Sequence, residues 1–175
     1  MSHQPCAIVG IGQTHHKKAR RDVSYAGLAR EAAIRALDDA HMTWSDIDAV
    51  VVGKAPDLFE GVMKPELYLS DALGATGKPM FRVHTAGSVG GTTGIVAAHH
   101  VETGRHKRVL AVALEKQSEG NAQFALGSGR GASLGAGGAF APYIRSYIHR
   151  SRWRNAPDAS VCSNSESLPA NHPGA

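Results

Sequence analysis

Residues 83–103 form the part of the sequence best suited to hold a reacting group. An apolar run that ends at His84 passes into a helical pattern whose first two turns are almost all glycine, serine and threonine. Each glycine disfavours a helix by up to about 1 kcal/mol, so this helix needs support from tertiary packing. We therefore expect a central helix enclosed between layers of the fold, with its N-terminus near Gly87 and Ser88.

The N-terminus of this helix has the chemistry of an anion or oxyanion site. Backbone N–H groups without intrahelical partners, and the positive end of the helix dipole, point at whatever lies near Gly87 and Ser88. The alternative is a packing helix for which Ser88 serves only as the N-cap. The residues by themselves leave both interpretations open.

Two other patterns lack parts that their chemistry requires. Gly10-Ile11-Gly12 follows an apolar run, but His15 stands where a dinucleotide-binding fingerprint needs its third glycine. His99 and His100 diverge on a helix, and neither has a histidine or carboxylate four residues further on. We therefore expect neither a nucleotide site at the first pattern nor a metal site at the second.

A basic run at residues 15–21 (HHKKARR) holds four of the nineteen Lys and Arg residues of a chain with net charge +4. No aromatic residue interleaves with the run, and no nucleic-acid-binding motif accompanies it, so we expect no nucleic-acid partner. Two interpretations of the run remain. It is either a solvated loop or a loop that meets the phosphates of a soluble ligand.

The elements that position these residues alternate between strand and helix patterns. Ser24 is placed to cap a helix, and Glu31 and Arg35 are spaced as an i,i+4 ion pair on its outer face. The order predicts an α/β fold with a mostly parallel sheet. The expected elements are a strand at 6–9, a helix at 25–40, a strand at 47–53, one or two short helices within 58–73, a strand at 80–84, a helix at 88–103 and a strand at 108–114.

Composition sets the domain organisation. We expect one incomplete domain over residues 1–150 and a disordered tail over residues 151–175, which are rich in serine and proline and include Cys162. No stretch approaches the roughly 18 apolar residues of a membrane helix, so we expect no membrane span. The N-terminus lacks a signal-peptide pattern and the two cysteines give no disulfide framework, so we expect a cytoplasmic, reducing location.

Taken together, the segments resemble the N-terminal half of the thiolase superfamily, with particular likeness to the thiolase-like lipid-transfer proteins related to sterol carrier protein x. The resemblance implies a thiolase-like N-terminal half with a buried central helix. It implies an acyl-CoA or steroid-CoA thioester as substrate, coenzyme A only as part of that substrate, and no separate cofactor. It also implies a homodimer or a hetero-oligomer. The segments that carry it are residues 7–14, 46–53, 83–103 and 109–116, with a further likeness at 135–141.

The chain departs from this family at the reacting position. The family carries a cysteine at the N-terminus of the helix, and the aligned residue here is Gly87. A serine hydroxyl has too high a pKa for a helix end to ionise, and no base for Ser88 is identifiable. We take Ser88 as the candidate catalytic residue, and His84, Gly87 and Gly90 as candidate substrate-binding residues.

Three functions therefore stay open. The first is a thiolase-like acyltransferase acting on acyl-CoA in lipid or steroid side-chain metabolism. The second, which Gly87 favours, is an aldolase subunit like the cysteine-free thiolase-like aldolases, which make or break a carbon–carbon bond on CoA thioesters without an acyl-enzyme. The third is a non-catalytic fragment that binds a lipid-CoA or a partner subunit. The half that supplies the family's catalytic histidine and second cysteine has no counterpart here, which implies a truncated chain.

Overall fold

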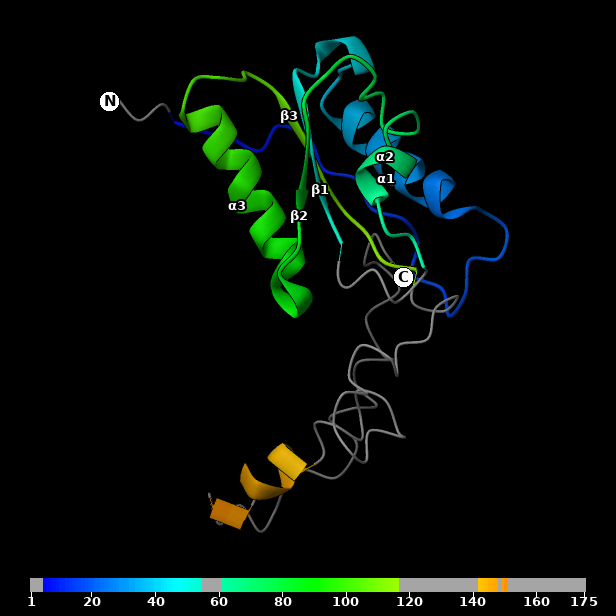
Figure 1. Cartoon of the computed structure of the whole chain (residues 1–175), viewed down its shortest axis with the longest axis vertical. Helices are drawn as coiled ribbons and strands as arrows, with labels where there is room; N and C mark the ends of the chain where they lie inside the picture. The colour runs from blue at the N-terminus through cyan, green and yellow to red at the C-terminus, as the bar shows by residue number, and fades with distance from the viewer. Residues whose placement is uncertain (1–4, 55–60, 117–141, 148, 151–175) are drawn as a thin grey trace. The chain divides into compact units, whose positions relative to one another are not determined.

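A parallel sheet of three strands organises the first of the two compact units, residues 1–120 and 121–175, into which the chain divides. The computed structural model describes residues 5–54, 61–116, 142–147 and 149–150 (Figure 1). The strands lie in the order β2-β1-β3, which confirms the α/β class and the parallel sheet. They are β1 (Ala49–Gly53), β2 (Met80–Val83) and β3 (Val109–Ala113).

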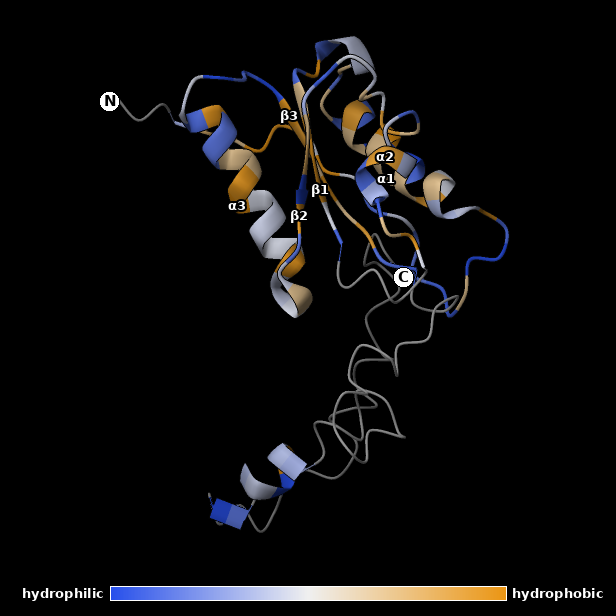
Figure 2. Ribbon diagram, in the orientation of Figure 1, coloured by the Kyte–Doolittle hydropathy of each residue, from blue (hydrophilic) through white to orange (hydrophobic). Residues whose placement is uncertain are grey.

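Helices cover both faces of this sheet (Figure 1). Helix α1 (Tyr25–Asp39) and the short α2 (Pro65–Tyr68) lie on one face, and α3 (Val89–Glu102) lies on the other. Side chains alternate across a strand, so Val50 and Val52 of β1 pack with α1, while Val51 packs with α3. β1 is buried along its whole length, and Figure 2 shows the strands as largely apolar.

Helix α1 begins as the sequence predicts. The Ser24 hydroxyl accepts a hydrogen bond from the backbone N–H of Gly27 at 3.0 Å, which is the expected N-cap. The predicted ion pair between Arg35 and Glu31 is present, with Arg35 Nη2 at 2.8 Å from Glu31 Oε1. Both local predictions for this helix are therefore confirmed.

The predicted strand at residues 6–9 is wrong. These residues have no regular secondary structure, and the Ile8 side chain is 87% exposed. The segment lies against α1 and does not pair with a strand, since Ile11 N donates to Asp39 Oδ2 at 2.8 Å. Gly10 and Gly12 lie so close to the backbone of α1 that a Cβ on either would overlap it. Contact with the helix has replaced a sheet ladder.

Helix α3 lies on the sheet as expected, but it is not enclosed on every side. Val89, Thr93 and Ala97 form its buried stripe, which faces the sheet. On the opposite side Gly90, Gly91 and Gly94 are exposed, and Ile95 is 58% exposed. No second layer among the described residues covers this side. Among the described residues α3 is therefore covered on its sheet side, and a second layer over its outer side stays a prediction.

Little of the second unit is described. Residues 142–147 and 149–150 are helical. The tail predicted over residues 151–175, with Cys162, lies outside the described residues, and the domain over residues 1–150 stays a prediction. None of the described helices has the length and apolar character needed to cross a membrane.

Candidate functional site

A sharp turn joins the end of β2 to the start of α3. His84 and Thr85 leave the strand, and a single 3₁₀ turn over Ala86–Ser88 precedes the first residue of the helix. Ala86 has a φ of +48°, a conformation that L residues other than glycine rarely adopt. The backbone N–H of Ser88 donates to the carbonyl of Thr85 at 3.2 Å, which helps to hold the turn.

Ser88 occupies the N-cap position without capping the helix through its side chain. Its hydroxyl donates to the carbonyl oxygen of Thr85 at 2.9 Å and so stabilises the turn. No histidine, carboxylate or amine in the described part of the chain hydrogen-bonds this hydroxyl. The geometry thus supplies no general base for Ser88, and its role as a catalytic residue stays a prediction.

Two threonines tie the turn to the first turns of α3. Thr85 Oγ1 donates to Thr92 Oγ1 at 3.1 Å, and Thr92 Oγ1 also lies 3.0 Å from the carbonyl oxygen of Ser88. Because the turn and the helix end are bonded to each other, the backbone N–H groups near Gly87 keep a fixed direction. Fixed donors of this kind are suited to stabilise a developing negative charge.

The predicted substrate-binding residues lie together at this turn. Gly87 and Gly90 both have open space where a Cβ would project, and neither has a positive φ. His84, Gly87, Ser88 and Gly90 are all exposed. A side chain at Gly87 would therefore project into space that no other described residue fills. Their role in binding stays a prediction.

Two buried lysines near the same edge of the sheet escaped the sequence analysis. Lys54 directly follows β1 and is 0% exposed, and Lys116 follows β3 and is 5% exposed. Lysines are rarely this buried, and the carboxyl edge of an open parallel sheet is where α/β proteins bind ligands. The sequence signal that could have identified Lys54 and Lys116 is the position of each lysine shortly after an apolar strand.

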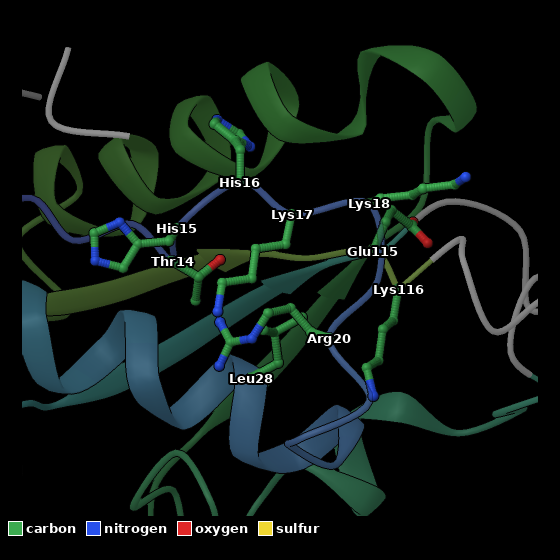
Figure 3. A pocket seen from close by; sticks show the side chains of 9 residues that line it. All are labelled: Thr14, His15, His16, Lys17, Lys18, Arg20, Leu28, Glu115 and Lys116. Atoms are coloured by element: carbon green, nitrogen blue, oxygen red, sulfur yellow. The ribbon is translucent and has the colours of Figure 1, made fainter. Parts of the chain in front are cut away.

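The basic run and Lys116 meet at a hollow of about 340 Å³, shown in Figure 3, which we call the basic hollow. Leu28 of α1 and the segment after β3 complete its walls. In Figure 3 the side chains of Lys17 and Arg20 extend toward one side of the hollow, and that of Lys18 extends the other way. The lining residues are Thr14, His15, His16, Lys17, Lys18, Arg20, Leu28, Glu115 and Lys116.

The described residues hold no group of three or more His, Cys, Asp or Glu side chains arranged to bind a metal ion. Cys6 is an exposed thiol in the segment beside α1, and neither the turn before α3 nor the basic hollow includes it. Neither site therefore has a thiol among its described residues.

Several known proteins are similar to this chain, although no protein-family model matches it. Sterol carrier protein 2 of Homo sapiens is 32% identical over 116 residues, which cover 65% of this chain and 21% of the relative. Acetyl-CoA acetyltransferase of Methanothermobacter thermautotrophicus is 32% identical over 117 residues, which cover 65% of this chain and 30% of the relative. The chain thus spans less than a third of the length of either relative.

Solved structures show the same likeness. A structure described as "Ltp2-ChsH2(DUF35) aldolase" is 27% identical, has a TM-score of 0.60, and matches 82% of this chain and 38% of its own. The 3-oxoacyl-[acyl-carrier-protein] synthase III of Aquifex aeolicus VF5 is 22% identical, covers 62% of this chain and 35% of its own with a TM-score of 0.51, and shows the fold alone. These sequence and structural similarities support membership of the chain in the thiolase superfamily.

Proposed function

We propose that this chain binds acyl-CoA thioesters and places the thioester at the turn Thr85–Ser88 before α3. The observation that carries the proposal is the passage of β2 through the left-handed Ala86 into the N-terminus of a 14-residue helix. Acetyl-CoA acetyltransferase, a relative that is 32% identical, supports the choice of a CoA thioester. The steroid or lipid part of the substrate rests on the similarity to sterol carrier protein 2.

The turn offers hydrogen-bond donors, and no described residue acts as a general base for the Ser88 hydroxyl. The backbone N–H of Val89 donates to the carbonyl of Ala86 in the preceding 3₁₀ turn. The next N–H groups in the first turn of α3 have no carbonyl within the helix to bond, and the helix dipole adds positive potential there. A thioester carbonyl oxygen placed against them gains stabilisation as it takes up negative charge. The hydrogen bonds of Thr85 and Thr92 hold these donors in place before the substrate arrives.

Within this function we favour aldol chemistry over acyl transfer, because Gly87 stands at the family's cysteine position. In aldol cleavage a base takes the proton of the β-hydroxyl, the bond between Cα and Cβ breaks, and its electrons pass to the thioester as an enolate. The enolate oxygen then needs donors but no covalent bond to the protein. The similarity to a solved aldolase supports this choice, and its description, which names Ltp2 and ChsH2(DUF35), supports a hetero-oligomer.

A non-catalytic role is the second candidate. The match covers only 21% of sterol carrier protein 2, and no described residue covers the outer side of α3 at Gly90 and Gly94. In that role the chain would hold a lipid-CoA or a partner subunit and would carry out no chemistry alone. Thiolase-like acyl transfer through Ser88 is the third candidate.

Calorimetry and intact-mass spectrometry separate these functions. We expect saturable binding of acetyl-CoA and of a steroid-acid CoA thioester, with no mass increase of the protein after incubation. A stable acyl adduct on Ser88 would support acyl transfer and contradict the aldolase assignment. If neither thioester gave binding heat or shifted the melting temperature, the proposed function would be contradicted.

A further inference from the structure

The basic hollow lies outside the turn that receives the thioester in the proposed function. We propose that it is a binding site for the phosphate groups of a small soluble ligand, held by Lys17 and Arg20, with Lys18 adding positive charge at the rim. The structure brings these three cations together with Lys116, which lies 96 positions after Arg20 in the chain. This inference does not depend on the proposed function, because it concerns a different ligand group and different residues.

Arg20 is held in place at one wall of the hollow. Its side chain is 13% exposed, its Nε lies 3.0 Å from Asp22 Oδ1, and its Nη2 lies 2.8 Å from Glu31 Oε2. Nη1 makes no hydrogen bond with any residue that the structure describes. A guanidinium has five donors in a rigid plane, so a fixed Arg20 keeps the two Nη1 donors for a ligand.

Lys17 and Lys18 stand at the exposed rim. Neither makes a hydrogen bond or an ion pair within the described part of the chain. The pKa of Asp22 is lowered first by its side-chain hydrogen bond with Arg20, and the nearby charge of Lys17 adds to that effect. With Arg20 and Lys116 the two lysines give four cationic side chains around the hollow, against the carboxylates of Asp22, Glu31 and Glu115. The net charge of these groups is positive even with His15 and His16 neutral, and a positive net charge favours the binding of an anion.

The loop that carries these cations is tied down at both ends. Arg35 Nη1 donates to the carbonyl of Gln13 at 2.6 Å, just before the basic run. Lys116 Nζ donates to the carbonyl of Val23 at 2.5 Å, just after it. A loop fixed in this way loses less conformational entropy when a ligand binds, so its cations are preorganised.

The lining favours phosphate over a nucleic-acid strand. None of the nine lining residues is Phe, Tyr or Trp, so the hollow offers no benzene or indole ring on which a base would stack. The volume of about 340 Å³ lies at the small end of small-molecule sites, which span roughly 300–1,000 Å³. The edge of the sheet after β3, which Glu115 and Lys116 continue, is where parallel α/β sheets bind ligands.

Titration calorimetry with inorganic phosphate and with pyrophosphate, at constant ionic strength, tests this inference on the full chain. We expect saturable binding of one anion per chain, with pyrophosphate the tighter ligand. The double variant Lys17→Gln/Lys18→Gln should weaken pyrophosphate binding about tenfold or more, since the charge-assisted contact of Lys17 and the positive charge of Lys18 at the rim are lost. Arg105→Gln/Lys107→Gln is the charge-matched control. Both residues are exposed and lie outside the hollow, so this variant should bind pyrophosphate as tightly as the wild type.

Arg20→Gln adds a second test, provided that circular dichroism shows that the variant is folded. It should bind pyrophosphate more weakly than the wild type. If it does not fold, the lysine double variant still decides the question. Absence of saturable heat with both anions would overturn the inference, as would equal affinity in the wild type and the lysine double variant. Tighter binding of a single-stranded RNA than of pyrophosphate would overturn the choice of a small ligand.

Discussion

Gly53 at the end of β1 lies so close to Thr93 of α3 that a Cβ on Gly53 would overlap the Thr93 hydroxyl oxygen. Thr93 is 1% exposed, and its hydroxyl donates to the carbonyl of Val89 at 2.6 Å, so the side chain has nowhere to move. The absence of a side chain at Gly53 therefore sets the height of α3 above the sheet. That height in turn places the turn at Ala86 relative to the carboxyl edge of the strands.

Gly53→Ala should therefore destabilise the protein. We expect a loss of about 1–3 kcal/mol in the free energy of unfolding, the usual cost of overpacking a filled core. Gly94→Ala is the matched control, since a Cβ there meets open space on the exposed side of α3. It should stabilise the helix by about 0.5–1 kcal/mol, because alanine loses less backbone entropy than glycine. Urea denaturation measures the free energy of unfolding of both variants. Equal changes for Gly53→Ala and Gly94→Ala would contradict the close contact between β1 and α3.

Helix α1 shows how local signals predict structure well. The cap at Ser24 and the pair between Glu31 and Arg35 each need only residues within one or two turns, and both are present. The segment at residues 6–9 shows the limit of such signals. An apolar run predicts a strand, but a strand needs a partner, and here Asp39 and the backbone of α1 take up this part of the chain.

The candidate site divides in the same way. The turn before α3 was predictable, because its glycines, serine and threonines are consecutive in the sequence. The left-handed Ala86 was not, because no composition signal marks an alanine with positive φ. The basic hollow also needed the fold, since only the parallel pairing of β1 and β3 brings Lys116 back to the loop that carries Lys17.

Gly87→Cys should fold normally and yet fail as a thiolase. The Cβ has open space and the backbone φ is not positive, so we expect unfolding free energy within about 0.5 kcal/mol of the wild type, as for other surface substitutions. Thiolysis also needs at least two groups that move protons, and at this turn the described residues offer only the imidazole of His84. Acetoacetyl-CoA consumption in the presence of CoA, with Gly87→Ala as control, should show no turnover. Measurable thiolysis by Gly87→Cys would contradict this argument.

Ser88→Ala should affect the turn and not the chemistry. The variant loses the hydrogen bond from the Ser88 hydroxyl to Thr85, which we expect to cost about 0.5–1.5 kcal/mol of stability. Affinity for acyl-CoA should change little, because the donors proposed for the thioester are backbone N–H groups. Thermal melting and calorimetry test the two halves of this prediction. Loss of all activity on a CoA thioester, with the fold intact, would identify Ser88 as a nucleophile.

Acid should weaken the fold partly through Asp48, which anchors the start of β3. Its Oδ2 accepts hydrogen bonds from the backbone N–H groups of Arg108 and Lys107, both at 2.9 Å. These bonds hold the pKa of Asp48 below its ordinary value, so the unfolded chain binds this proton more readily than the folded chain. The stabilisation is complete above the unfolded pKa of about 3.9 and is lost as pH falls through the lower folded pKa.

Asp48→Asn should therefore be less stable than the wild type near neutral pH and should lose less stability on acidification. Its amide oxygen still accepts a hydrogen bond, but it carries no charge that acid can remove. The carboxyl of Asp46 titrates in the same direction, since backbone and side-chain hydrogen bonds from Thr43 lower its pKa, so part of the acid slope will remain. Asp38→Asn, an exposed position on α1, should keep the wild-type slope. Urea unfolding across an acidic pH series measures each slope, and equal slopes for Asp48→Asn and Asp38→Asn would show that Asp48 does not anchor β3.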